Sequence, residues 1–139
     1  MLLTIERVSA LKRVSLFERT PDRVLAGIAH TLEEQTFAPG EDLMTEGAVE
    51  DWMFVLVDGT VRITRSDRAV QLGPGEVVGE LAVLDPQPRA GTVTALTEVL
   101  AFRLRKVDFD EALRTRPEVA AGVIGELVER LRESHGTGT

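Results

Sequence analysis

The sequence of 139 residues contains no cysteine, and histidine occurs only twice. Without cysteine there is no disulfide framework, no thiolate zinc site and no cysteine nucleophile. His30 lies in a predicted helix and His135 near the C-terminus, neither beside a metal ligand, so the β-forming part has no histidine for a metal site. That part also offers no general base at the spacing of a hydrolytic triad. We therefore expect no metal, no cofactor and no enzymatic activity.

Positive charge and long apolar runs are also scarce. The net charge is −7, whereas a protein that holds DNA or RNA through its phosphates needs a basic face. No apolar run approaches the roughly 18 residues of a transmembrane helix. The N-terminal residues 1–16 alternate apolar and charged side chains too often for a signal peptide. We expect a cytoplasmic protein without a direct nucleic-acid partner and without membrane insertion.

What remains is the composition of one globular domain. The hydrophobic share is 43% and the charged share 28%, close to globular averages, and the length suffices for a core without disulfides. We predict a single domain over residues 1–134 and a flexible tail over 135–139. Within the domain, we expect N-terminal helices in 3–33, a β unit in 34–106 and two closing helices in 107–133.

Helical signals occur at both ends of the chain. Thr20-Pro21-Asp22 supplies a capping hydroxyl, a proline at the first helical position and an acid in the first turn. Asp108 is the expected cap of a short helix near the C-terminus, and Pro117 opens a longer one that extends to about Arg132. The apolar stripe of this last helix, which comprises Val123, Ile124, Leu127, Val128 and Leu131, is expected to pack on its own domain. A second copy of the chain is the alternative.

Between the helices, the pattern changes to that of strands. Residues 52–57 are apolar on both faces, as in an enclosed strand, and Asp58-Gly59 predicts a type I′ hairpin turn after it. Further turns are predicted at 66–68 and 73–75. The last strand alternates around Leu100, Phe102 and Leu104.

The segment 75–93 departs from this strand pattern and carries the candidate chemistry. Gly79 allows close approach of a ligand to the backbone, and a short helix is expected from Glu80 to Leu84. Arg89 offers a planar guanidinium that suits a pair of phosphate oxygens. We interpret Glu80 as an acceptor for a sugar hydroxyl next to that phosphate. The alternative is a structural ion pair between Glu80 and Arg89 that pins a loop.

The runs 79–84 and 88–93 resemble the phosphate-binding cassette of cyclic nucleotide-binding domains, and the resemblance covers nearly the whole chain. It extends to Leu16-Phe17, to residues 37–41, to Asp108-Phe109 and to residues 116–118. This family implies a mainly β fold: an antiparallel β-roll (a double-stranded β-helix jelly roll) with N-terminal helices and two C-terminal helices.

The resemblance assigns roles residue by residue. It gives Glu80 to the ribose 2′-hydroxyl and Arg89 to the exocyclic phosphate oxygens. Gly79, Leu81 and Ala82 would border the ribose phosphate, Ala90 would donate its backbone N–H, Ile63 and Val70 would face the base, and Leu127, Arg130 and Leu131 are candidate lids over it. Alanine at position 90, where threonine favours cyclic GMP, points to cyclic AMP.

Gly91 also belongs to this ligand-binding set, and it departs from the alanine that is usual there. We expect the substitution to loosen the end of the cassette by roughly 0.5–1 kcal/mol. No segment after Leu131 resembles a DNA-binding, kinase or channel domain.

The function implied is that of a sensor in which nucleotide binding moves the C-terminal helices and acts on an effector protein or a further domain. A homodimer through the last helix fits this function. The alternative function is a protein-docking module of the same fold that works without nucleotide.

Overall fold

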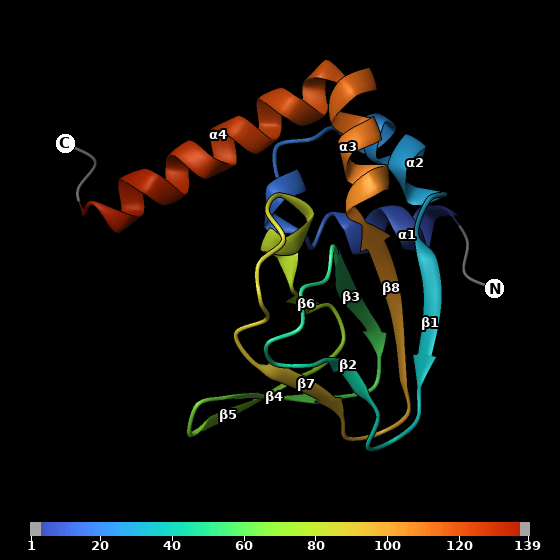
Figure 1. The fold of residues 1–139 in the computed structure, drawn as a ribbon. Helices are drawn as coiled ribbons and strands as arrows, with labels where there is room; N and C mark the ends of the chain where they lie inside the picture. The colour runs from blue at the N-terminus through green and yellow to red at the C-terminus, as the bar shows by residue number, and fades with distance from the viewer. Residues whose placement is uncertain (1–3, 137–139) are drawn as a thin grey trace.

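The computed structural model of the chain describes residues 4–136, with helices gathered at one end of a β-roll (Figure 1). The N-terminal helical elements are α1 (Thr4–Leu11), a 3₁₀ turn η1 (Ser15–Phe17) and α2 (Asp22–Ala29). The strands are β1 (Glu33–Phe37), β2 (Asp42–Met44), β3 (Trp52–Asp58), β4 (Val61–Arg65), β5 (Arg68–Leu72), β6 (Val77–Val78), β7 (Thr92–Ala95) and β8 (Val99–Arg105). A second 3₁₀ turn, η2 (Glu80–Val83), separates β6 from β7, and α3 (Lys106–Thr115) and α4 (Pro117–Ser134) follow β8.

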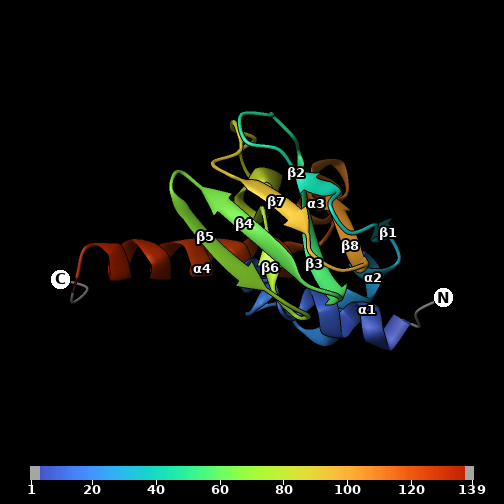
Figure 2. The same ribbon diagram turned by 90° about the horizontal axis from the view of Figure 1, so that it is seen from below.

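The strands form two antiparallel four-stranded sheets. One sheet has the order β1-β8-β3-β6 and the other β2-β7-β4-β5. Figure 2 shows the second sheet, with β5, β4 and β7 side by side, from below. The predicted fold class, an antiparallel β-roll with flanking helices, is confirmed.

The core has two parts, and β3 and β8 contribute to both. Met53 and Val55 on one face of β3 pack in a cluster with the helices, whereas Phe54 and Leu56 on the other face pack between the two sheets. Alternate side chains of a strand point to opposite faces. The uninterrupted apolar run of β3 therefore reflects burial on both sides, as the sequence predicts for an enclosed strand.

Two predicted helix caps are wrong. Helix α2 begins at Asp22 without a side-chain cap, and Thr20 is buried with no hydrogen-bond partner for its hydroxyl among the described residues. A Cβ atom on Gly122 would lie 3.2 Å from this hydroxyl, so Thr20 is turned toward α4 by tertiary packing. Helix α3 begins at Lys106 rather than after Asp108, whose carboxylate instead pairs with Arg105 at 3.3 Å.

The predicted hairpin at Asp58-Gly59 is also wrong, because β3 and β4 lie in different sheets. A type I′ turn needs positive φ at both central residues, and of these two only Gly59 has it, at 88°. Asp58 remains in β3 and pairs with Leu100 of β8. A Cβ atom on Gly59 would lie 2.2 Å from the carbonyl oxygen of Glu98. The glycine thus permits a crossover between sheets that passes close to the backbone before β8.

Helix α4 packs on its own domain through only part of its apolar stripe. Val123 is buried and Leu127 packs against the helical part of the core. Ile124, Val128 and Leu131 are exposed, at 62%, 39% and 58%. Figure 1 shows the C-terminal half of α4 projecting beyond the strands. The expectation that the whole stripe packs on its own domain is therefore wrong for this outer part.

The predicted flexible tail is described only in part. The backbone N–H groups of His135 and Gly136 donate to the carbonyls of Leu131 and Glu133 and close the end of α4. Residues 137–139 of the predicted tail, and residue 3 of the predicted N-terminal helical region, lie outside the described residues. No helix within 4–136 combines the length and the apolar character that crossing a bilayer requires.

Candidate functional site

The segment from η2 to β7 encloses a pocket of about 600 Å³ against the second sheet. Its walls come from η2, from the loop between η2 and β7, and from strands β2, β4 and β7. The lining residues are Met44, Ile63, Arg65, Gly79, Glu80, Leu81, Ala82, Leu84, Asp85, Gln87, Pro88, Arg89, Ala90, Gly91 and Val93. One continuous segment of sequence therefore supplies most of the pocket.

Gly79 brings the backbone at the start of η2 against the guanidinium of Arg89. Its φ of 76° lies in the left-handed region that glycine adopts without strain. A Cβ atom here would lie 2.6 Å from Nη1 of Arg89 and 3.0 Å from Cε of Met44. Glycine is therefore required both by the backbone conformation and by the close approach of the cation.

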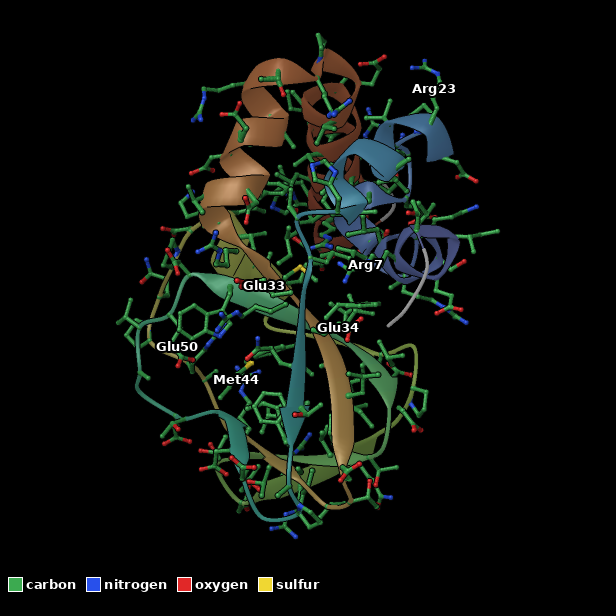
Figure 3. All side chains as sticks on the ribbon, turned by 90° about the vertical axis from the view of Figure 1, so that its right-hand side faces the viewer. Arg7, Arg23, Glu33, Glu34, Met44 and Glu50 are labelled. Carbon is green, nitrogen blue, oxygen red and sulfur yellow. The ribbon has the colours of Figure 1, made fainter. Side chains whose placement is uncertain are left out.

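Arg89 is a buried cation, with only 7% of the residue exposed. Its Nε donates to Oε1 of Glu50 at 3.0 Å, and its Nη2 donates to the carbonyl oxygen of Trp52 at 2.6 Å. Neither bond engages Nη1, which lies beside Gly79. Figure 3 shows Glu50 and Met44 on the same side of the roll. Two fixed bonds thus orient the guanidinium and leave one edge for a ligand.

The backbone around Arg89 is fixed as well. The N–H of Arg89 donates to the carbonyl of Ala48 at 2.8 Å, and the N–H of Gly47 donates to the carbonyl of Arg89 at 2.9 Å. Pro88 forms an isolated antiparallel bridge with Val49. The connection between β2 and β3 therefore supports the loop that carries the arginine.

Glu80 is held from two other elements of the fold. Its carboxylate accepts hydrogen bonds from the hydroxyl of Ser15 at 3.1–3.2 Å and from the backbone N–H of Leu16 at 3.0 Å. Nη2 of Arg130 on α4 donates to Oε1 of Glu80 at 2.8 Å and also contacts the Ser15 hydroxyl. Glu126 adds a second carboxylate 3.5 Å from Nε of Arg130.

The environment of Arg130 favours its charged form. Burial alone would lower the pKa of its guanidinium, but the hydrogen bond to Glu80 and the charges of Glu80 and Glu126 outweigh burial, so the pKa is raised above its ordinary value. The contact of Arg130 with Glu80, at 2.8 Å, has the geometry of a salt bridge.

Glu80 and Arg89 both line the pocket but are not paired with each other. Arg89 pairs with Glu50, and Glu80 pairs with Arg130. The alternative in which these two residues form a structural ion pair with one another is therefore contradicted. Their separate partners leave the space between them open as a pocket.

Some of the other predicted site residues line the pocket and some do not. Ile63, Leu81, Ala82, Ala90 and Gly91 line the pocket together with Gly79. Val70 pairs with Ile63 across β4 and β5 but is exposed and is not among the lining residues. Leu127, Arg130 and Leu131 do not line the pocket either, because α4 packs on η1 rather than over the mouth.

The structure explains why glycine, rather than the alanine usual in the family, stands at position 91. A Cβ atom at this position would lie 2.5 Å from the carbonyl oxygen of Thr64 on β4. The cassette therefore approaches β4 too closely for alanine in this chain, so glycine here fits a tighter contact rather than a looser one.

Several residues of the site were not assigned by the sequence analysis, and Arg65, Glu50 and Ser15 are the ones with charged or polar side chains that matter most here. Arg65 follows Ile63 by two positions on β4 and lines the pocket from the same face. Because residues two positions apart on a strand share a face, the position of Ile63 could have predicted that of Arg65. Glu50 and Ser15 act through partners 39 and 65 positions away, for which the sequence holds no local signal. No group of three or more metal-ligating side chains occurs among residues 4–136.

Comparisons with known proteins identify the family of the chain. The family model for the cyclic nucleotide-binding domain matches residues 34–116. The chain is 34% identical, over 84% of its length, to a cyclic nucleotide-gated potassium channel of Rhizobium etli. It is 27% identical, over 90% of its length, to a CRP-like cAMP-activated global transcriptional regulator of Mycobacterium tuberculosis.

A solved structure, the N-terminal domain of a transcriptional regulator from Streptomyces coelicolor A3(2), superposes with a TM-score of 0.84 at 35% identity and covers 91% of this chain and 92% of that one. The chain spans only 33% of the channel and 58% of the mycobacterial regulator. These relatives are regulatory or channel proteins. From the family match, the fold and the pocket together, the chain belongs to the family of cyclic nucleotide-binding domains.

Proposed function

We propose that this chain binds a 3′,5′-cyclic nucleotide, preferentially cyclic AMP, in the pocket between η2 and the β2-β7-β4-β5 sheet. The observation that carries the proposal is the buried Arg89, oriented by Glu50 and by the carbonyl of Trp52, whose Nη1 beside Gly79 has no hydrogen-bond partner among residues 4–136. Burying a cation is unfavourable unless it is paired. A phosphate at the free edge adds a charge-assisted partner where little water competes.

The remaining walls suit the rest of the ligand. Glu80 supplies an acceptor for the ribose hydroxyl, and Ile63 and Val93 supply apolar surface for a base. Ala90 has no side-chain hydroxyl to bond a guanine amino group, which supports adenine over guanine by the family resemblance. Cyclic GMP is accordingly the less favoured ligand.

Calorimetric titration tests the proposal. Cyclic AMP should bind with measurable heat and raise the melting temperature, and cyclic GMP should bind more weakly. Arg89→Leu should abolish binding and Glu80→Ala should weaken it. Arg62→Leu is the matched control, because Arg62 is exposed on the same strand as Ile63 and does not line the pocket.

Two results would count against the proposal. Wild-type protein that shows neither heat nor a melting shift at millimolar cyclic AMP would refute nucleotide binding. Equal binding by wild type and by Arg89→Leu, with Arg62→Leu unchanged, would refute the site. Tighter binding of cyclic GMP would refute only the preference for adenine.

We further propose that the exposed stripe of α4 pairs with a second copy of the chain, so that the domain signals as a homodimer to an effector. Ile124, Val128 and Leu131 recur at spacings of four and three residues along α4, and the last two lie on its projecting C-terminal half. Sedimentation velocity should show a dimer that Leu131→Glu dissociates. A monomeric wild type at all concentrations, with and without cyclic AMP, would contradict this pairing and favour docking of an unrelated protein.

A further inference from the structure

The carboxylate of Glu80 is fixed by two elements that come from opposite ends of the chain. Ser15 and Leu16 belong to η1, and Arg130 belongs to the C-terminal half of α4. The side chain of Glu80 is 18% exposed, and the residue still lines the pocket. The fold therefore holds this carboxylate through groups of η1 and α4 that lie outside the pocket lining, while Glu80 itself is a lining residue.

Counting the donors among residues 4–136 shows that the carboxylate keeps an unused acceptor site. A carboxylate offers about four acceptor sites. The hydroxyl of Ser15 has one hydrogen to share between the two oxygens, the N–H of Leu16 supplies a second donor, and Arg130 supplies a third. One acceptor site is left after these three bonds, which suffices for one further hydroxyl donor.

Charge supports the same arrangement. A carboxylate at the wall of an anion pocket repels the incoming phosphate unless a cation neutralises it. Arg130 lies 2.8 Å from Glu80 and offsets the charge of that carboxylate, although it is shared with Glu126 at 3.5 Å. Arg130 does not reach the pocket lining, so it acts on the ligand through Glu80.

We propose that Ser15 and Arg130 are positioning residues that orient the Glu80 carboxylate toward the ribose 2′-hydroxyl of the nucleotide. This inference rests on the proposed function and assigns Arg130 a role other than that of a lid over the base. It also couples the pocket to α4 through one side chain. Ligand binding and the docking of α4 on Glu80 therefore strengthen each other by the same factor.

The test compares cyclic AMP with 2′-deoxy cyclic AMP, which lacks only the hydroxyl that Glu80 would bind. Wild type should bind cyclic AMP roughly ten-fold or more tightly than the deoxy nucleotide, as expected for one hydrogen bond to a charged acceptor. In Arg130→Gln and Ser15→Ala this ratio should fall toward one, while affinity for the deoxy nucleotide changes little. Arg130→Lys, which keeps the charge, should restore part of the ratio.

Arg132→Gln is the matched control, because Arg132 is exposed on the same helix and outside the pocket lining. It should keep the wild-type ratio. Retained binding of the deoxy nucleotide shows that each variant is folded at the pocket, so loss of structure is separable from loss of positioning.

The outcomes separate this inference from the proposed function. If wild type discriminates against the deoxy nucleotide and the Arg130 and Ser15 variants keep the full ratio, positioning is refuted and nucleotide binding stands. If Arg130→Gln binds cyclic AMP more tightly than wild type, Arg130 competes with the ribose and the inference is again overturned. Wild type that binds neither nucleotide overturns the proposed function and this inference together.

Discussion

Replacing Gly79 by alanine perturbs the pocket at the point where backbone and cation meet. Alanine in the left-handed region costs about 1–2 kcal/mol. The new Cβ atom also lies 2.6 Å from Nη1 of Arg89, so the buried guanidinium must shift away from Glu50 or from the carbonyl of Trp52. Losing one hydrogen bond to a charged group adds about 1.5–3 kcal/mol. We expect Gly79→Ala to lower the free energy of unfolding by about 2.5–5 kcal/mol.

Gly40→Ala isolates the backbone contribution to this loss. Gly40 has a φ of 91°, and a Cβ atom there would meet nothing within 4 Å. Its substitution should lower the free energy of unfolding by only about 1–2 kcal/mol. Urea unfolding followed by the fluorescence of Trp52, the only tryptophan, measures both variants.

Binding provides a second readout for the same pair. Gly79→Ala should weaken cyclic AMP binding because Arg89 is displaced, whereas Gly40→Ala should leave it unchanged. Equal stability losses in the two variants, with equal nucleotide affinity, would refute the claim that Gly79 is required by the close approach of Arg89.

Three further predictions concern stability outside the pocket. Thr20→Val should leave stability unchanged or raise it by about 1 kcal/mol in urea unfolding, because the buried hydroxyl of Thr20 has no partner among the described residues; a marked loss would reveal a bond to that hydroxyl. Phe109→Ala should cost about 3–5 kcal/mol, since Phe109 is fully buried with its ring centroid 5.8 Å from that of Phe17, and a loss below 1 kcal/mol would contradict this packing. The backbone N–H of its own residue and the side chain of Arg23 lower the pKa of Glu118 below its ordinary 4.5, so its carboxylate stabilises the fold above that pH. The stability advantage of wild type over Glu118→Gln should therefore shrink as the pH falls below 4.5 in a series of thermal melts, and an advantage that grows on acidification would contradict this sign.

The sequence was sufficient for the features that local rules control. Strand alternation and the doubly apolar run 52–57 predicted a β region with an enclosed strand, and the helical period predicted α4 from Pro117. Gly79, Glu80 and Arg89 could be assigned to one site because they lie within eleven positions of one another, in a segment whose turns bring them to one pocket. The resemblance to cyclic nucleotide-binding domains was most specific in this same segment and extended to residues on both sides of it.

Tertiary structure decided which partner each of these residues has. Glu50 reaches Arg89 across 39 positions, and Arg130 reaches Glu80 across 50, so no local pattern indicates either pair. The burial of Thr20 against α4 likewise overrode a capping signal that the local sequence favours. Local rules fix φ, ψ and the facing of side chains within an element, whereas partners depend on how distant elements pack. The chain alone therefore determined where the pocket forms, and the packing of η1, α4 and the connection between β2 and β3 determined how its charges are held.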